Sequence, residues 1–244
     1  MSWEPAPNVL PALADSLHLW FFSLETSAEE RARLLPLLSS DERARAERFV
    51  VERPRRQMIV GRGRLRETLG RYLDRDPASL RFDYGDDGKP FLVRDDGEDR
   101  PLEFNLSHSG TVALLGVVDH GRLGVDVETV RYDTDHLAIA VRFFSEIERE
   151  RLARFSTEEI PHAFFRCWTR KEAYLKAVGT GLRRPLAGFD VDFAEDDHAA
   201  LLATRFDEDE AARWSLAPVN VGVDHAAAWC LDWTPSTTRR YQLD

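Results

Sequence analysis

Lysine is nearly absent from this sequence: of the 33 basic residues, only three are lysines. They are Lys89, Lys171 and Lys176, and each falls within one of the motifs described below. Arginine keeps its proton near neutral pH, whereas lysine can release one and presents a compact charge to phosphate. The three positions are therefore candidates for contacts that arginine would not make equally well.

Cysteine and long apolar runs are also scarce. Two cysteines, Cys167 and Cys230, are too few for a disulfide framework, and neither stands in a metal-binding spacing such as C-x-x-C. No run approaches the roughly 18 apolar residues that span a bilayer. The first residues also lack the basic start and apolar stretch of a signal peptide. We expect a reduced, cytoplasmic protein.

The chain lacks an overall positive charge. Its net charge of −10 argues against general nucleic-acid binding. Residues 31–71 nevertheless hold twelve arginines against five acids, a local charge of +7, so the rest of the chain carries −17. A basic segment in an acidic protein suggests a site for a small polyanion. Solvated helix faces with i, i+4 ion pairs would account for many of these arginines equally well.

Two segments of the chain resemble each other. Ser39–Phe49 and Ser145–Phe155 share serine, glutamate, arginine and phenylalanine at equivalent positions. Each predicts a helix that opens at its serine, since serine can accept hydrogen bonds from free backbone N–H groups at a helix start. A longer helix is predicted after each segment, near 54–73 in the first case and 160–178 in the second.

Strands are predicted where β-branched, aromatic and alternating residues gather. They cover residues 18–22, 80–84, 112–118, 124–128, 189–193, 213–218 and 226–233. The clusters Gly85–Gly88 and Asp95–Gly97 predict turns, and no Pro/Ser-rich linker interrupts the chain. We therefore predict an α+β fold of two similar α+β halves, residues 1–120 and 121–244, with the functional site at their interface.

The pentapeptide Gly124–Glu128 carries the central signal, because it places two acids on one strand. Residues two apart point to the same face, so Asp126 and Glu128 would project together while Val125 and Val127 enter the core. Adjacent carboxylates repel each other unless a cation joins them, and Mg²⁺ prefers such oxygen ligands. The alternative is a strand edge with two solvated acids.

A second signal lies in the predicted helix 160–178. Glu172 and Lys176 stand four residues apart, at the border of an apolar stripe. The stripe consists of Phe164, Trp168, Leu175 and Val178. The pair could be an ordinary salt bridge within the helix, or a partly desolvated pair that acts on a ligand.

Two further motifs precede the central one. Phe104–Gly110 is expected to be a loop in which Ser107 and His108 offer groups suited to phosphate oxygens, although a lone histidine can equally be structural. A serine hydrolase is excluded because no G-x-S-x-G elbow is present. Gly88–Phe91 presents Lys89 beside Pro90 on a glycine turn and says little alone.

In this order, the motifs resemble those of the Sfp-type 4′-phosphopantetheinyl transferase family. The residues that carry the resemblance are Gly88–Pro90, Phe104–Ser109, Gly124–Glu128 and Trp168–Leu182. The fold of that family, two similar α+β halves with the site between them, agrees with the internal repeat. The resemblance implies an enzyme that moves the phosphopantetheine group of coenzyme A to a serine of an apo acyl or peptidyl carrier protein, releasing 3′,5′-ADP.

The resemblance also implies roles for individual residues. Asp126, Glu128 and Glu172 would ligate Mg²⁺, with Mn²⁺ as the alternative, and Glu172 would also be the base for the carrier serine. Lys176 would neutralise or protonate the departing 3′,5′-ADP. Coenzyme A would be contacted by Arg45, Lys89, Pro90, Ser107 and His108. The choice of Arg45 for the 3′-phosphate is open to replacement by Arg43, Arg55 or Arg56.

The predicted helix Phe143–Phe155 could meet the carrier protein through Phe143, Phe144 and Ile147, or these side chains could be ordinary core residues. Because one chain holds both halves, a monomer is expected. Two other functions remain open: a different Mg²⁺-dependent enzyme that cleaves a pyrophosphate, and a catalytically silent module that binds coenzyme A or a carrier protein.

Overall fold

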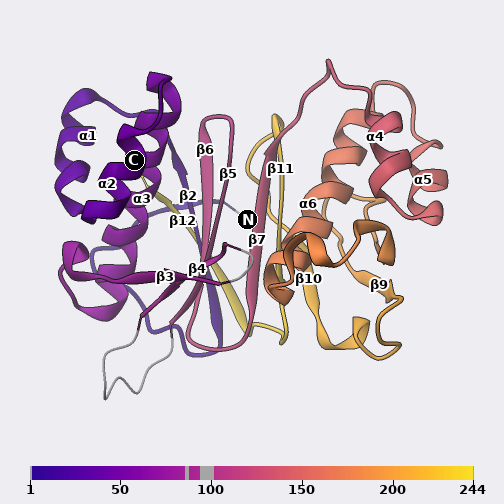
Figure 1. The fold of residues 1–244 in the computed structure, drawn as a ribbon. Helices are drawn as coiled ribbons and strands as arrows, with labels where there is room; N and C mark the ends of the chain where they lie inside the picture. Colours follow the sequence, from indigo (N-terminus) through magenta and orange to yellow (C-terminus); the bar gives the residue numbers. More distant parts are fainter. Residues whose placement is uncertain (1, 86–87, 94–101, 244) are drawn as a thin grey trace.

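Two small sheets form the centre of the structure, and helices cover their outer faces (Figure 1). The structure is a computed structural model that describes residues 2–85, 88–93 and 102–243. The layers follow the order helix, sheet, sheet, helix, with α1 to α3 at one end and α4 to α6 at the other (Figure 1). None of the helices in these ranges has the length and apolarity needed to cross a membrane.

Apart from the first strand, β1, and strand β12, the helices and strands follow one another in the same order in the two halves. The first half contains β1 (Glu4–Pro5), β2 (Ser16–Ser23), α1 (Ala28–Leu34), α2 (Ser40–Glu47), α3 (Glu52–Leu73), β3 (Phe82–Tyr84), β4 (Pro90–Leu92), β5 (Glu103–Ser109) and β6 (Val112–Val118). The second contains β7 (Leu123–Thr129), α4 (His136–Phe143), α5 (Glu146–Leu152), α6 (Ile160–Val178), β8 (Phe189–Val191), β9 (Leu201–Thr204), β10 (Ser215–Pro218), β11 (His225–Leu231) and β12 (Thr237–Leu243).

The sheet topology repeats as well. Strands β2, β6 and β5 lie side by side in antiparallel order, and β7, β11 and β10 form the same arrangement in the second half. Each long helix is followed by a short hairpin, β3–β4 in the first half and β8–β9 in the second. The predicted α+β fold of two similar halves is confirmed.

The last strand of the chain does not stay with the second half. Strand β12 pairs in parallel with β2, with Thr237 opposite Ser16, and β1 pairs with its other edge. The first sheet therefore has the order β1-β12-β2-β6-β5. The division of the chain at residue 120 stays a prediction, because β12 links the two ends of the chain.

Alternating side chains on the central strands fill the space on both faces of the first sheet. On β2, Leu17 and Leu19 are fully buried between the two sheets, together with residues of β6, β7 and β11. The intervening Trp20 and Phe22 are buried against the helical layer of the first half. The halves therefore share an apolar interface, and each also has a core of its own under its helices.

The short helices α2 and α5 begin with the same capping box, as the serine caps predicted. In each, the glutamate three residues after the serine accepts a hydrogen bond from the serine backbone N–H. These glutamates, Glu42 and Glu148, are also buried and pair with the long helix that follows. The Glu42 carboxylate lies 2.6 Å from Arg66, and the Glu148 carboxylate lies 2.6 Å from Lys171.

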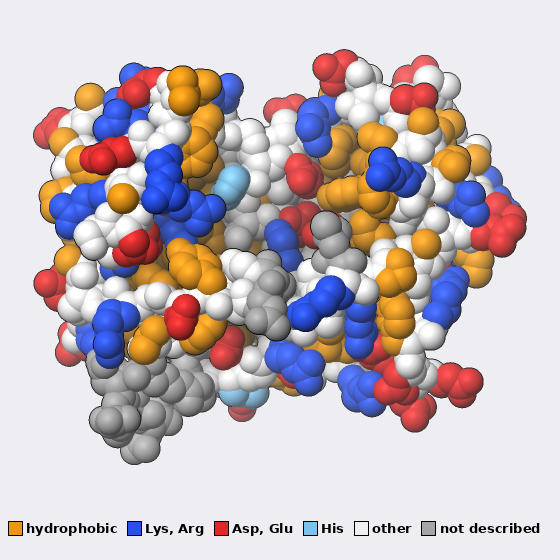
Figure 2. Space-filling model, viewed as in Figure 1, with side chains coloured by type: hydrophobic (Ala, Val, Ile, Leu, Met, Phe, Trp, Pro, Cys, Tyr) orange, Lys and Arg blue, Asp and Glu red, His pale blue; other side chains and the backbone are white. Residues whose placement is uncertain are grey.

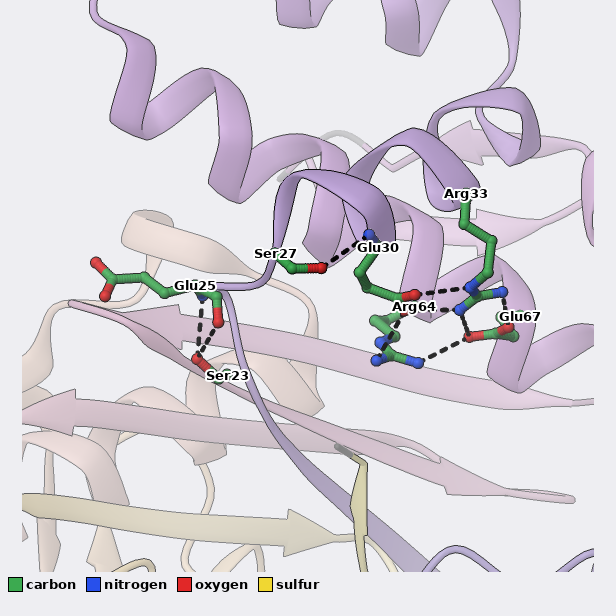
Figure 3. A network of polar contacts seen from close by, with 7 residues as sticks. All are labelled: Ser23, Glu25, Ser27, Glu30, Arg33, Arg64 and Glu67. Carbon is green, nitrogen blue, oxygen red and sulfur yellow. Dashed lines mark hydrogen bonds and ion pairs between the residues drawn. The ribbon is translucent and has the colours of Figure 1, made fainter.

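Part of the arginine-rich segment serves structure rather than ligand binding. Glu30 and Arg33 of α1 meet Arg64 and Glu67 of α3 in a network of ion pairs (Figure 3). Arg33 lies 2.6 Å from Glu67, and Arg64 lies 2.9 Å from Glu30. By contrast, within the described residues the side chain of Arg45 on α2 is exposed and forms no ion pair or hydrogen bond.

Two predicted elements were wrong. The expected loop at 104–110 is strand β5, which pairs with β6 along its whole length. Of the expected helix 143–155, residues 146–152 form α5 and Phe143 is the last residue of α4, because Ser145 has an extended backbone and caps α5. The predicted turn at 95–97 lies outside the described residues. In the other predicted turn, Gly88 N–H donates to the Gly85 carbonyl at 2.8 Å.

Candidate functional site

Helix α6 lies unusually close to strand β7, and Gly124 makes this approach possible. A Cβ atom at Gly124 would lie 2.0 Å from the Ala173 carbonyl oxygen and 2.5 Å from the Ala177 amide nitrogen. Any other residue would collide with the helix backbone. The close contact places the last two turns of α6 beside Asp126, on the face of β7 opposite the shared apolar interface.

Asp126 is the most buried acid of the candidate site. Its Oδ1 atom accepts hydrogen bonds from Lys176 Nζ at 2.6 Å and from Ser107 Oγ at 2.8 Å. Lys176 also donates to Ser107 Oγ at 2.9 Å, so the three side chains form a closed triangle. The other carboxylate oxygen, Oδ2, is buried without a hydrogen-bond partner in the described structure. A buried carboxylate oxygen without a donor is a strong acceptor for a cation.

Glu128 lies two residues further along β7 and is partly buried. It accepts a hydrogen bond from Ser109 Oγ at 2.6 Å. Burial raises the pKa of Glu128; the hydrogen bond from Ser109 opposes this rise, and the negative charge of Asp126 adds to it. The two acids of the central motif therefore share a face, as the strand periodicity predicted.

Glu172 approaches the same acids from α6. Burial raises its pKa to about 7, and the charges of Asp126 and Glu128 contribute, while Lys176 acts in the opposite direction. A carboxyl group with a pKa near neutrality can both accept and release a proton at working pH. Glu172 is therefore partly desolvated, while Lys176 forms its ion pair with Asp126 of β7; that the two act on a ligand stays a prediction.

Carboxylate oxygens are the donors that a hard divalent ion prefers, and Asp126, Glu128 and Glu172 are near enough for their charges to act on one another. Within the described part of the chain, no group of three or more acidic, histidine or cysteine side chains is gathered tightly enough to ligate one ion. Mg²⁺ usually takes only one or two carboxylates from a protein and keeps water and phosphate oxygens. The partnerless Oδ2 of Asp126 and the raised pKa values of Glu128 and Glu172 fit this mode of binding.

The other predicted contacts come from the first half. Lys89 Nζ donates to the Leu123 carbonyl at 2.7 Å and to the Lys176 carbonyl at 3.3 Å, so it reaches the second half. Pro90 follows in β4 and is half-buried. His108 is exposed on β5, and partial desolvation together with the charge of Lys176 lowers its pKa.

The structure therefore brings together most of the predicted residues. Direct hydrogen bonds join Ser107, Asp126 and Lys176, and Lys89 bonds to the backbone of Lys176. The charges of this group act on His108, Glu128 and Glu172. No contact in the described ranges joins Arg45 to this group. Figure 2 shows a hollow between the halves, where acidic, basic and histidine side chains meet.

Sequence reasoning missed two residues that shape the site. Gly124 was treated only as the start of a strand, and Ser109 only as part of a phosphate-binding loop. A glycine inside a strand pattern signals a close approach of another backbone, which is the role of Gly124. The alternation of polar residues in Phe104–Ser109 is a signal for a strand with one polar face.

A separate cavity of about 560 Å³ lies near the first turns of α6 and the β10–β11 loop. Its arginines are already occupied: Arg170 donates to the carbonyls of Asp192 and Glu195, and Arg166 donates to the carbonyl of Phe193. The acids of β7 and the second half of α6 do not line it. We therefore do not assign the site to this cavity.

The fold and the site define a class of protein with a duplicated α+β chain and an acid cluster between its halves. Comparison with known sequences gives the family. A sequence model described as "4'-phosphopantetheinyl transferase superfamily" matches residues 122–230, and one described as "4'-phosphopantetheinyl transferase, N-terminal" matches residues 24–118. The chain belongs to the 4′-phosphopantetheinyl transferase superfamily, so the resemblance and the expected enzyme class are confirmed.

Individual relatives agree with this assignment. The chain is 43% identical to the 4′-phosphopantetheinyl transferase HetI of Nostoc sp., over 75% of this chain and 77% of that protein. It is 30% identical to the 4′-phosphopantetheinyl transferase Sfp of Bacillus subtilis, over 72% and 75% of the two chains. It is 29% identical to the L-aminoadipate-semialdehyde dehydrogenase-phosphopantetheinyl transferase of Mus musculus, over 75% of this chain and 60% of that protein.

Proposed function

We propose that this protein transfers the phosphopantetheine group of coenzyme A to a serine of an apo acyl or peptidyl carrier protein, releases 3′,5′-ADP and requires Mg²⁺, with Mn²⁺ as a substitute. One observation carries the proposal beyond family membership. Asp126 of β7 pairs with Lys176 of α6, both bond to Ser107 of the first half, and the charge of Asp126 acts on Glu172 of α6. This arrangement suits a substrate that carries a pyrophosphate.

The acids Asp126, Glu128 and Glu172 would hold the metal ion. When bound, the ion would supply positive charge to the pyrophosphate oxygens, which is its main contribution to phosphoryl transfer. The protein supplies the burial that makes these acids hold a cation strongly. It also supplies Lys176, whose ammonium group already neutralises one oxygen of Asp126.

In the transfer, the serine oxygen of the carrier forms a bond to the phosphorus next to the pantetheine, and the bond from that phosphorus to the bridging oxygen breaks. Glu172 accepts the serine proton, directly or through water, since its pKa of about 7 suits a base at neutral pH. Lys176 neutralises or protonates the oxygen of the departing 3′,5′-ADP.

The remaining predicted residues would contact coenzyme A. Arg45 would bind the 3′-phosphate, since its guanidinium has no partner within the described residues. Lys89 and Pro90 would lie at the adenine end, and His108 would contact a phosphate. Ser107 would act on the same phosphate indirectly, through Asp126 and Lys176, because its hydroxyl already bonds to both of these side chains.

The test is the mass of a carrier protein. Apo carrier protein is incubated with the enzyme, coenzyme A and Mg²⁺, and the carrier is then weighed by mass spectrometry. We expect a gain equal to one phosphopantetheine group, which disappears when EDTA is added. Asp126→Asn is expected to lose the transfer while it keeps its fold by circular dichroism.

Two other functions give different results in the same assay. Cleavage of coenzyme A without a gain in carrier mass would indicate a different pyrophosphate-cleaving enzyme. Binding of coenzyme A or carrier without either reaction would indicate a silent module. We also propose that the protein acts as a monomer, since both halves of the site come from one chain. The low cysteine count supports the further proposal that it works in the reducing cytoplasm.

A further inference from the structure

Strands β5 and β7 run side by side at the boundary between the halves, but in the described ranges they belong to different sheets. Side chains join them in place of a backbone ladder. Three residues of β5 accept backbone N–H groups of β7. These bonds are Val125 N–H to Asn105 Oδ1 at 2.8 Å, Val127 N–H to Ser107 Oγ at 3.4 Å, and Thr129 N–H to Ser109 Oγ at 3.1 Å.

We call these three residues, Asn105, Ser107 and Ser109, the polar ladder. They alternate along β5, so their side chains point to one face of the strand. Each contacts the residue twenty positions further along the chain, which keeps a constant register between the two strands. The polar ladder satisfies backbone donors at the edge of β7 that would otherwise be unpaired.

The two serines of the polar ladder also donate hydrogen bonds, besides accepting them from backbone N–H groups. A hydroxyl has one proton and two acceptor sites. Because Ser107 and Ser109 accept N–H groups, each is turned so that its proton can go to a carboxylate. Ser107 donates to Asp126 at 2.8 Å, and Ser109 donates to Glu128 at 2.6 Å. The two contacts repeat the same geometry two residues apart.

We propose that Ser109 is a positioning residue that holds the Glu128 carboxylate in place for a divalent ion, as Ser107 holds Asp126. The proposal deepens the function proposed above and rests on it. A glutamate has three rotatable bonds and, when free, samples many rotamers. The hydrogen bond from Ser109 fixes its far end, while the bond from Thr129 N–H fixes Ser109.

The first member of the polar ladder provides a matched control. Asn105 accepts from Val125 N–H as the serines accept from their partners, but the neighbouring residue of β7 is Gly124, which has no side chain to orient. A change at Asn105 removes one link between the halves and touches no acid. A change at Ser109 removes a link and releases Glu128 as well.

The experiment compares Ser109→Ala, Ser109→Thr and Asn105→Ala with the wild-type protein. Mn²⁺ affinity is measured by electron paramagnetic resonance, and unfolding temperature is measured with and without Mn²⁺. We expect Ser109→Ala to weaken Mn²⁺ binding roughly tenfold, the size typical of lost partners behind metal ligands. Ser109→Thr keeps the hydroxyl and should restore most of the affinity. Asn105→Ala should lower the unfolding temperature but keep the Mn²⁺ affinity within about twofold.

The outcomes separate this proposal from the function on which it rests. If the wild-type protein binds Mn²⁺ and Ser109→Ala binds it equally well, the role of Ser109 is refuted while the proposed function stands. The role is also refuted if Asn105→Ala loses as much affinity as Ser109→Ala. Should Asn105→Ala not fold, Asn105→Ser replaces it as control, because serine keeps an acceptor. Absence of Mn²⁺ binding by the wild-type protein overturns both proposals.

Discussion

Lys171 donates to both carboxylate oxygens of Glu148 at 2.6 Å, inside the core of the second half, although it directly precedes Glu172 in the chain. Its ammonium group also donates to the Phe189 carbonyl, and Glu148 accepts the Val191 N–H. One of the three lysines of the chain is therefore structural. It joins α5, α6 and β8, while its neighbour Glu172 lies in the field of Asp126 and Glu128.

Breaking this pair should strongly destabilise the fold. Glu148→Gln leaves the Lys171 ammonium buried without a counter-charge, and removal of one partner of a buried ion pair costs about 3–5 kcal/mol. The free energy of unfolding in urea measures the loss. Glu42→Gln is the matched variant, because Glu42 and Arg66 form the corresponding pair in the first half. An unchanged unfolding free energy in Glu148→Gln would contradict the structural role.

Gly124→Ala should be more damaging than its size suggests. The added methyl group would meet the Ala173 carbonyl at 2.0 Å, so α6 must move away from β7. Overpacking typically costs about 1–3 kcal/mol, and backbone atoms yield less than side chains, so we expect a loss of at least about 3 kcal/mol and loss of transfer activity. Thermal unfolding and the carrier mass assay measure the two effects.

Gly61→Ala is the control for this prediction. Gly61 lies within α3, where a Cβ atom would make ordinary contact with Leu24 at 3.5 Å. Alanine favours a helix over glycine by roughly 1 kcal/mol, so this variant should be slightly more stable than the wild-type protein. Gly124→Ala with wild-type stability would show that β7 and α6 do not pack as described.

Glu172→Gln should stabilise the metal-free protein at alkaline pH. Burial and the charges of Asp126 and Glu128 raise the pKa of Glu172 to about 7, so the folded state favours the protonated form. The stability that comes from burying Glu172 in its protonated form is fully present below about pH 4.3, the ordinary pKa of glutamate. This stability is lost as the pH rises through about 7, the pKa of Glu172 in the folded protein. At pH 8 the variant should therefore be more stable than the wild type, by up to about 3 kcal/mol.

Urea unfolding in EDTA at pH 4.5 and pH 8 tests whether Glu172→Gln is more stable than the wild type at the higher pH. The difference between Glu172→Gln and wild type should be small at the lower pH, because Glu172 of the folded protein is protonated there and an unfolded glutamate is only about half ionised. Mg²⁺ at pH 8 should stabilise the wild type more than the variant, because only the ionised carboxylate binds a cation. A variant that is less stable than wild type at pH 8 without metal would contradict the raised pKa.

Lys176→Arg separates charge from proton donation. Arginine keeps the positive charge beside Asp126 but does not give up a proton near neutral pH. If Lys176 protonates the leaving group, the rate of transfer should fall by about 10² or more, while the KM for coenzyme A changes little. A near-normal rate would reduce Lys176 to an electrostatic role. Steady-state kinetics with a carrier protein distinguish proton donation by Lys176 from a purely electrostatic role.

Arg45→Ala should weaken binding of coenzyme A through its 3′-phosphate. A hydrogen bond to a charged group is worth about 1.5–3 kcal/mol, so we expect the KM for coenzyme A to rise at least about tenfold. The KM for 3′-dephospho-coenzyme A should not change. Arg53→Ala is the control, since Arg53 is also exposed but pairs with Glu25. An equal rise in KM for coenzyme A and for 3′-dephospho-coenzyme A would show that Arg45 does not bind the 3′-phosphate.

Much of the site could be predicted because its residues follow local periodicities. The two acids of β7 share a face because a strand has a period of two, and Glu172 and Lys176 share a helix face because they are four residues apart. The resemblance to a family then connected these separate motifs. The long helices were predicted well for the same reason, with α6 observed at Ile160–Val178.

The rest depends on contacts between distant segments. The polar motif at 104–110 predicts a phosphate-binding loop, whereas the segment is strand β5, whose Asn105, Ser107 and Ser109 face β7 and satisfy its backbone N–H groups. Strand β12 was not predicted because its sequence, Thr237–Leu243, is largely polar and lies near the outer edge of the first sheet. No local pattern reports which edge a strand will join.

The position of β12 has a consequence for synthesis in the cell. The first half leaves the ribosome with one edge of β2 uncovered, because the strand that covers it, Thr237–Leu243, is made long after β2. That edge must wait until some two hundred further residues have emerged, and an exposed strand edge is a hazard for aggregation. The first sheet can therefore be closed only after Thr237–Leu243 have been made, when β12 joins β2 and links the two ends of the described chain.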